Sequence, residues 1–274
     1  MAVSHVLDPA VVITDSELAT TAAAALPPVS AITAVTECED QPVSESLGLA
    51  EVLALVPDPR DPRGVRHSLP SVLLITVVAV LAGARNLLAI AEQAADLSQE
   101  QLRRLGAWRH PRRGVLVAPS YATFSRLLHA VDAAELDALV GGWLLGRARA
   151  LRSLGQLAGV ALDGKVLRGA LTAGGQLRLL QAVLHEPGVT IAQVAVPDET
   201  TETTQVKALL TGVDIAGMVA TADAAHTNKT TAAYLVEVKR AGYVLPVKGN
   251  TPGLLAAVAT RLAGPSSAWN EYLT

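Results

Sequence analysis

Two short apolar runs, each followed by a single aspartate, constrain this chain most. Residues 157–162 precede Asp163, and residues 217–222 precede Asp223. Both runs predict buried strands, and α/β proteins place ligands and chemistry where such strands leave the core. We therefore expect two carboxylates at strand ends, where they suit a hard cation such as Mg²⁺. Taken singly, an aspartate just after a strand is more often a turn former or a helix N-cap than a metal ligand.

The segments between and after these aspartates predict a definite order of elements. A turn at 185–188, marked by Pro187 and Gly188, indicates a hairpin between two apolar runs. The full set after the first strand is a strand at 176–184, a strand at 189–196, a helix at 203–213, a strand at 218–222, a helix at 229–241 and a strand at 243–247. This is the order of a ribonuclease-H-like mixed sheet, so the expected fold class is α/β.

Several longer blocks occur in a fixed order along the chain. They are residues 163–169 (Asp-Gly-Lys-Val-Leu-Arg-Gly), 221–227 (Thr-Ala-Asp-Ala-Ala-His-Thr) and 243–250 (Tyr-Val-Leu-Pro-Val-Lys-Gly-Asn), with 58–69 and 119–126 upstream. The first three blocks resemble bacterial insertion-sequence transposases of the ISAs type, also called H-repeat-associated proteins. The upstream blocks resemble that family's N-terminal helical domain, and the resemblance covers about residues 50 to 262.

The resemblance implies a DDE-type DNA transposase, in which three carboxylates hold two divalent ions, Mg²⁺ or Mn²⁺, at a scissile phosphodiester. Asp163 would bridge both ions and Asp223 would hold one. Such ions activate the attacking hydroxyl and stabilise the leaving oxygen, so no covalent enzyme intermediate is needed. The implied partners are DNA at the element ends and at the target, and a further copy of the chain. The implied location is the bacterial cytoplasm, at the nucleoid.

The family's third catalytic glutamate has no counterpart in its usual place. Beyond Asp223 the acidic residues are Glu237, inside the predicted helix at 229–241, and Glu271, three residues from the end. We therefore expect a C-terminally truncated, degenerate transposase with one sheet face left uncovered. Glu202, at the start of the helix at 203–213, is a candidate accessory carboxylate. The helix dipole explains a glutamate in that first turn equally well.

Basic residues predict where DNA phosphates would bind. Lys165, Arg168 and Lys248 lie near the expected strand ends, although ordinary solvated charge explains them about as well. The densest basic cluster surrounds Trp108, and we assign phosphate contacts there to Arg104, Arg109, Arg112 and Arg113. Arg60, Arg63 and Arg66 are expected to join this surface. A solvated basic loop remains the alternative, because no base-reading motif is present.

The net charge of −3 conceals an uneven distribution along the chain. Residues 1–47 contain seven acidic residues and no Lys or Arg, and the remaining 227 residues carry 22 basic and 18 acidic residues. We expect an acidic disordered tail at 1–47, an all-helical domain at 48–152 and the catalytic core at 157–274.

Segment lengths and composition exclude some structures and binding modes for these domains. The helices expected in the second region are 71–84, 87–105, 120–131 and 133–151, and the first falls short of the ~20 residues that span a bilayer. Cys38 is the only cysteine, which excludes an internal disulfide. The aromatic content of 3% makes base stacking an unexpected binding mode.

Two other classes of protein remain open. A ribonuclease-H-fold nuclease could cut nucleic acid with Asp163, Glu202 and Asp223 and without strand transfer. A non-catalytic, regulatory fragment could bind element ends and interfere with an intact transposase. Metal-dependent cleavage of an RNA–DNA hybrid would indicate the nuclease, and binding of element ends without cleavage would indicate the fragment.

Overall fold

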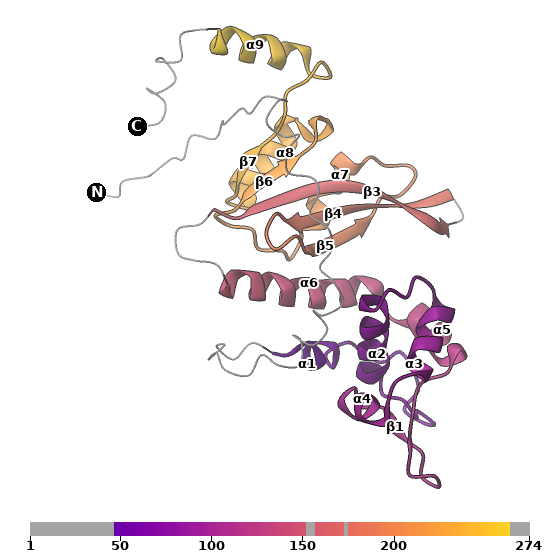
Figure 1. Ribbon diagram of the computed structural model, residues 1–274. Helices are drawn as coiled ribbons and strands as arrows, with labels where there is room; N and C mark the ends of the chain where they lie inside the picture. Colours follow the sequence, from indigo (N-terminus) through magenta and orange to yellow (C-terminus); the bar gives the residue numbers. More distant parts are fainter. Residues whose placement is uncertain (1–46, 152–156, 173–174, 264–274) are drawn as a thin grey trace. The chain divides into compact units, whose positions relative to one another are not determined.

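The computed structural model describes residues 47–151, 157–172 and 175–263. These residues fall into two compact units, which meet in the sequence between Arg147 and Ala148. Figure 1 shows the helical N-terminal unit in indigo to magenta and the sheet of the second unit in red to orange. The units are described separately below.

The N-terminal unit is built around α2, whose thirteen residues are almost wholly apolar. Its elements are α1 (Leu49–Leu53), α2 (Leu69–Leu81), α3 (Leu87–Ala95), α4 (Gln99–Arg104), β1 (Trp108–Arg109), β2 (Leu116–Val117), α5 (Tyr121–Ala130) and most of α6 (Ala133–Ala150). Val72, Ile75 and Phe124 are fully buried in one hydrophobic core. This burial explains the apolar character of α2 without a membrane. No helix in the described residues is both long and apolar enough for a membrane span.

The helix expected at 87–105 is broken into α3 and α4. Ser98 begins α4 through a capping box, in which its hydroxyl accepts from the Gln101 N–H at 3.2 Å and the Gln101 side chain accepts from the Ser98 N–H at 2.9 Å. The apolar periodicity runs across the break, so the interruption is set by the cap. Asn86 and Ser120 cap α3 and α5 with a single side-chain bond each, accepting from the Ala89 and Thr123 N–H.

The expectation of an all-helical domain at 48–152 is corrected by a short antiparallel ribbon. Trp108 pairs with Val117 and Arg109 with Leu116. The side chain of Gln99 holds this ribbon to α4, because its amide accepts from the Leu116 N–H at 2.8 Å and donates to the Leu116 carbonyl at 3.0 Å. The turn between β1 and β2 contains Gly114 at a φ of 66°, a conformation that favours glycine.

The second unit is a mixed α/β structure, as expected. Its elements are β3 (Gly159–Thr172), β4 (Gly175–Leu184), β5 (Thr190–Ala195), α7 (Glu202–Leu210), β6 (Val219–Ala222), η3 (Ala224–His226), α8 (Lys229–Ala233), η4 (Tyr234–Val238), β7 (Gly242–Val244) and α9 (Pro252–Leu262). The strand order is β5-β4-β3-β6-β7. Strands β3, β4 and β5 are antiparallel, whereas β6 is parallel to β3 and β7 is parallel to β6.

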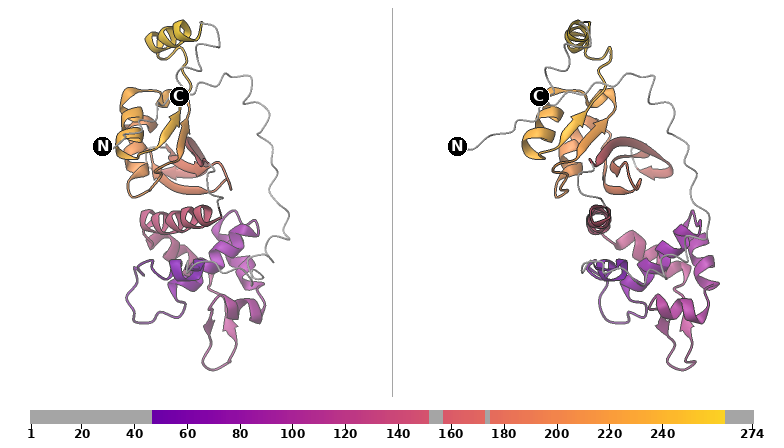
Figure 2. Two further views of the ribbon diagram at one scale, coloured as in Figure 1. Left: turned by 90° about the vertical axis from the view of Figure 1, so that its left-hand side faces the viewer. Right: turned by 60° about the vertical axis from the view of Figure 1, so that its left-hand side comes forward.

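Strand β3 is longer than expected, and this corrects the placement of Asp163 at a strand end. Asp163 pairs with Gln181 of β4, and the pairing continues with an irregularity between Val166 and Leu171. The parallel pairing of β3 with β6, in contrast, ends at Leu162 and Ala222. The aspartate therefore lies where one neighbouring strand ends and the other continues. Figure 2 shows the long β3–β4 ribbon curling along its length.

The two faces of this sheet differ in burial. Val160, Leu180 and Ala220 point to one face and are fully buried, and α7 contacts β4 and β5. Helical segments α7 and η4 lie side by side, since the Tyr234 hydroxyl of η4 donates to the Lys207 carbonyl of α7 at 3.5 Å. On the other face, Ala161, Val183 and Thr221 are only partly buried. Asp163 belongs to this more open face, since side chains alternate along a strand.

Candidate functional site

Asp163 and Asp223 occupy equivalent positions on neighbouring parallel strands. Leu162 of β3 is paired with Ala222 of β6, and each aspartate follows its paired residue directly. Because neighbouring strands lie about 4.8 Å apart, the two backbones leave this pairing side by side. Both side chains are open to solvent, with exposed fractions of 57% for Asp163 and 73% for Asp223. Sequence-distant carboxylates are thus brought to one edge of the sheet.

A local hydrogen bond orients the carboxylate of Asp223. Its Oδ1 accepts from the Ala225 N–H at 2.9 Å and so caps η3. The Nε2 of His226 lies 4.0 Å from the same oxygen. His226 is almost completely buried, and its Nδ1 has no hydrogen-bond partner among the described residues. A buried imidazole therefore lies beside this carboxylate.

The block at 243–250 is fastened to the Asp223 loop. Asn250 donates through Nδ2 to the Ala224 carbonyl at 2.7 Å, and the Thr227 hydroxyl donates to the Pro246 carbonyl at 2.7 Å. Lys248 lies on this connection and is exposed. All three sequence blocks of this unit therefore meet at the same sheet edge.

The basic residues expected at this edge of the sheet differ in their surroundings. The Lys165 ammonium lies 4.0 Å from Asp163 Oδ2 and is about half exposed, so it accompanies the carboxylate on the same face. Lys248 forms no ion pair within the described residues. The side chain of Arg168 lies outside the described part of the structure, as does Glu271.

Glu202 reaches β3 but from the opposite face. It is the first residue of α7, and a Cβ added to Gly164 would lie 2.2 Å from both of its carboxylate oxygens. Because Gly164 follows Asp163, the two positions point to opposite sides of the strand. Across the described ranges, no group of three or more His, Cys, Asp or Glu side chains could hold a metal ion. The expected accessory carboxylate therefore lies against Gly164, the residue after Asp163, but does not complete a three-ligand cluster.

The donor chemistry of Asp163 and Asp223 nevertheless fits a hard divalent ion. Mg²⁺ is commonly held by one or two carboxylates together with substrate phosphates and water. Two exposed carboxylates at one edge supply that number of protein ligands.

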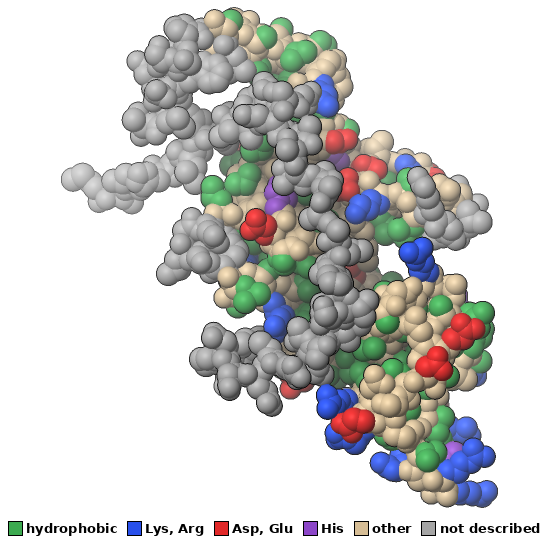
Figure 3. All heavy atoms as spheres, viewed as in Figure 1, with side chains coloured by type: hydrophobic (Ala, Val, Ile, Leu, Met, Phe, Trp, Pro, Cys, Tyr) green, Lys and Arg blue, Asp and Glu red, His purple; other side chains and the backbone are tan. Residues whose placement is uncertain are grey.

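The basic cluster around Trp108 separates into two parts. The Glu100 carboxylate accepts hydrogen bonds from the guanidinium groups of Arg103 at 2.7 Å and Arg104 at 2.9 Å. These bonds lower the pKa of the Glu100 carboxyl to about 2. Arg109 donates to the Gly114 carbonyl inside its own turn. The charge of Arg104 is thus offset on α4, and the guanidinium of Arg109 is engaged locally. Figure 3 shows several arginine side chains, in blue, gathered at the end of the unit that carries the β1–β2 turn.

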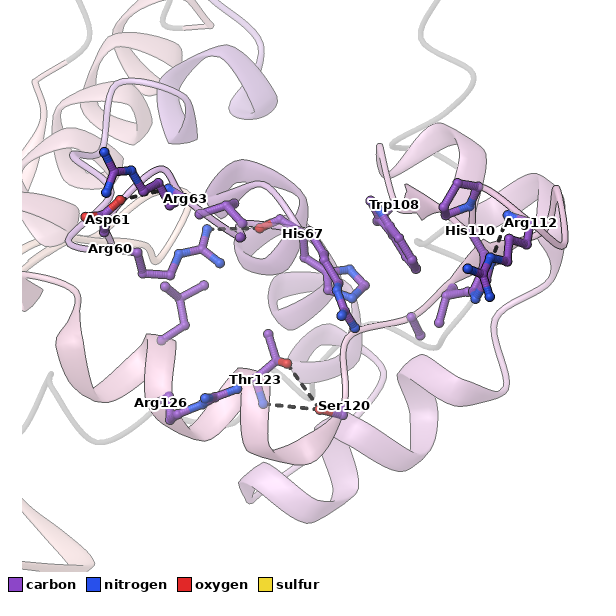
Figure 4. Close-up of a pocket in the computed structure, with 17 residues that line it drawn as sticks. Arg60, Asp61, Arg63, His67, Trp108, His110, Arg112, Ser120, Thr123 and Arg126 are labelled. Atoms are coloured by element: carbon purple, nitrogen blue, oxygen red, sulfur yellow. Dashed lines mark hydrogen bonds between the residues drawn. The ribbon is translucent and has the colours of Figure 1, made fainter.

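The other part lines a cavity of about 1120 Å³ in the N-terminal unit. Arg112 is the assigned residue that lies there, and Arg113 is not among its lining residues. The sequence reasoning missed Arg126, which α5 contributes. Arginines at this cavity come from three segments, and they are Arg60, Arg63, Arg66, Arg112 and Arg126. Figure 4 shows these segments converging around His67 and Trp108.

Comparison with known proteins identifies the class of this chain. The model of the DDE_Tnp_1-associated family matches residues 50–144, which lie in the N-terminal unit. "Putative transposase YncI" of Escherichia coli O157:H7 is 28% identical over 205 residues, which are 74% of this chain and 50% of that protein. "H repeat-associated putative transposase YhhI" of Escherichia coli K12 is 26% identical over 204 residues, covering 73% of this chain and 51% of that protein.

A third relative, "Uncharacterized protein in dhlA 3'region" of Xanthobacter autotrophicus, is 31% identical over 203 residues, which are 73% of this chain and 65% of that protein. The chain thus spans about half the length of several curated relatives that it matches. These matches together support an ISAs-type, H repeat-associated transposase family for this chain. Among solved structures, a piggyBac transposase synaptic complex with hairpin DNA gives a TM-score of 0.33 at 13% identity over 74% of this chain and 47% of that one, which is too low to build on.

Proposed function

We propose that this chain is the metal-dependent DNA transposase of a bacterial insertion sequence and that Asp163 and Asp223 are its catalytic carboxylates. The register of β3 and β6 carries the proposal, because it sets both aspartates directly beyond the Leu162–Ala222 pair. The strand order supports a ribonuclease-H-like core for this unit. Its substrates would be phosphodiesters at the element ends and at the target, in the cytoplasm at the nucleoid.

The residues at this edge suit distinct tasks in that reaction. Asp163 and Asp223 would hold Mg²⁺ or Mn²⁺, which lowers the pKa of an attacking water or 3′-hydroxyl and offsets charge on the leaving oxygen. The Ala225 N–H keeps one oxygen of Asp223 oriented. Lys165 and Lys248 are exposed beside the carboxylates and would contact DNA phosphates, which positions the strand without reading its sequence.

We expect slow strand transfer from these residues alone. The described part of the sheet edge offers two carboxylates, and α9, the helix after the Lys-Gly-Asn block, contains no acidic residue. Glu237 lies exposed on η4, ahead of β7. A third carboxylate ordinarily fixes the metal position and with it the attack geometry, so the two carboxylates in the described part of this edge should by themselves give only slow strand transfer.

Metal binding and DNA cleavage test the proposal together. Mn²⁺ binding is followed by electron paramagnetic resonance, and cleavage of element-end DNA by gel electrophoresis. Asp163→Asn and Asp223→Asn should each weaken Mn²⁺ binding and abolish any cleavage. Glu237→Gln removes the same charge from an exposed position on η4 and should leave both unchanged.

Two results would contradict the assignment. Mn²⁺ binding that survives both aspartate substitutions would place the metal elsewhere. Binding of element-end DNA with no cleavage, in Mg²⁺ or Mn²⁺ and at any enzyme concentration, would indicate a regulatory fragment in place of a catalyst.

A further inference from the structure

The cavity of the N-terminal unit is formed by residues 60–67 and by two later segments that follow each other closely in sequence. Residues 60–67 form one side, β1 and its following turn contribute Trp108 and Arg112, and the start of α5 contributes Ser120 to Leu127. Figure 4 shows His67 next to Trp108, with Arg126 on the α5 side and Arg112 beyond Trp108. A volume of about 1120 Å³ accommodates more than one nucleotide-sized group.

Most of the positive charge at this cavity is not neutralised by the protein. Arg60 is paired with Asp58 at 2.6 Å and donates to the His67 carbonyl at 2.9 Å, so its role is to hold the loop. The other four arginines have no carboxylate within 4.0 Å in the described ranges, and they are Arg63, Arg66, Arg112 and Arg126. All four are exposed. The cavity is therefore suited to a ligand that carries several negative charges.

Trp108 gives the cavity an aromatic wall that phosphate binding alone would not require. Its ring centroid lies 5.9 Å from that of His67 and 5.4 Å from that of His110, and both rings are inclined to it. The guanidinium carbon of Arg66 lies 5.8 Å from the indole centroid. The two imidazoles hold the indole in one orientation, while the ring itself remains partly exposed to the cavity.

His67 adds a buried polar atom at the same wall. Its Nδ1 is buried and has no hydrogen-bond partner among the described residues. Burial, together with the nearby charges of Arg60 and Arg66, lowers the pKa of this imidazole. The ring is therefore neutral at pH 7, and it adds no charge to that of the arginines.

We propose that this cavity binds an unpaired stretch of DNA, with one base stacked on Trp108 and its flanking phosphates held by Arg63, Arg66, Arg112 and Arg126. A base can stack on an indole only after it has left the duplex, and such stacking tolerates any base. An acidic peptide would satisfy the arginines but would leave the indole unused. The choice of DNA as the polymer rests on the proposed transposase function.

Fluorescence anisotropy of a labelled oligothymidylate tests the proposal with the full chain. EDTA is present throughout, so a failure of metal-dependent cleavage leaves this measurement unaffected. We expect the single strand to bind more tightly than a duplex of equal length at the same salt concentration. Trp108→Ala should weaken single-strand binding about tenfold or more, and Trp108→Phe, which keeps an aromatic ring, should restore part of it.

Charge variants separate this cavity from general electrostatic attraction. Arg112→Ala and Arg126→Ala should each weaken binding and reduce the slope of log affinity against log salt by about one. Arg85→Ala removes the same charge from an exposed position outside the cavity and should have little effect. The arginine side chains are exposed, so these variants should remain folded.

The proposal is overturned by any of three results. Equal affinity for duplex and single strand would show that the backbone alone is bound. If Trp108→Ala melts like the parent chain and binds the single strand equally well, no base is stacked on Trp108. Competition by polyglutamate as effective as that by unlabelled oligothymidylate would show that the arginines select charge without regard to the base.

Discussion

Two glycines of β3 show how individual residues shape the sheet edge. At Gly159 an added Cβ would lie 2.5 Å from Nδ1 of His185, whose other ring nitrogen lies 2.9 Å from the Thr221 hydroxyl. At Gly164 an added Cβ would meet the carboxylate of Glu202. The first neighbour is a ring held by a hydrogen bond, and the second is the end of a flexible side chain. The same substitution should therefore have different consequences at the two sites.

Gly159→Ala is expected to lower the free energy of unfolding by about 1–3 kcal/mol, because the imidazole of His185 has to move away from Thr221. Gly164→Ala should cost less than about 1 kcal/mol, because Glu202 can swing aside. Urea unfolding followed by circular dichroism measures both. In a double-mutant cycle, His185→Ala should recover part of the Gly159→Ala loss. Equal losses at the two glycines would refute this account.

The pKa of His67 predicts a pH dependence for the N-terminal unit. Burial first, then Arg60 and Arg66, lowers the folded-state pKa below the ordinary value of 6.5. The unfolded chain therefore binds the proton more readily, and stability that is complete above pH 6.5 is lost as the pH falls toward the folded-state pKa. The difference between the melting temperatures at pH 7.5 and pH 5.5 should be smaller for His67→Gln than for the parent chain. His129→Gln, at an exposed position on α5, should leave the difference unchanged.

The sequence located single residues where a local pattern marks them. Asp163 and Asp223 were recognisable because each follows an apolar run, and those runs are paired as β3 and β6. Arg126 was not recognisable as a cavity residue, since nothing in the α5 sequence indicates that Arg63 and Trp108 come close to it. The sequence also did not indicate that Arg112 lines the cavity whereas Arg104 is held elsewhere. Arg104 forms an ion pair with Glu100 within α4.

At the level of elements, helix and strand types followed from periodicity, whereas their boundaries depended on side chains. The break between α3 and α4 depends on Ser98 and Gln101. The β1–β2 ribbon depends on the Gln99 amide, seventeen residues from its partner Leu116. The extension of β3 past Asp163 depends on its pairing with β4. Apolar patterning carries no information about such contacts, so the strand end and the all-helical domain were wrongly predicted.

The capping box at Ser98 can be tested directly. Ser98→Ala removes the acceptor for the Gln101 N–H and should cost about 0.5–2 kcal/mol of stability. Ser98→Asp supplies another good cap and should retain most of it. Denaturant unfolding of the whole chain measures the difference. The break between α3 and α4 would need another explanation if the alanine and aspartate variants were equally stable.

At the level of the whole molecule, burial is uneven within the second unit. One face of the sheet is packed beneath α7 and η4, whereas apolar side chains on the other face are only partly buried. Leu254 and Leu255 of α9 are also exposed, at 46% and 39%. Exposed apolar surface of this kind usually marks an interaction or an aggregation liability.

We therefore expect the native chain to bind the dye 8-anilinonaphthalene-1-sulfonate and to associate as its concentration rises. Sedimentation velocity over a hundredfold concentration range measures the association. Leu254→Gln combined with Leu255→Gln should reduce both effects, because it removes two exposed apolar side chains. A monodisperse chain that does not bind the dye would contradict the prediction.

The pairing of β3 with β6 also links the core to the carboxylates. Val160 lies opposite Ala220, and both are fully buried, so these small apolar residues fix how far β6 extends along β3. A slip of β6 by one residue would turn Thr221 into the core and carry Asp223 away from Asp163. The packing of these two buried residues thus sets the distance between the carboxylates. A substitution at either residue would therefore change the metal affinity of the sheet edge.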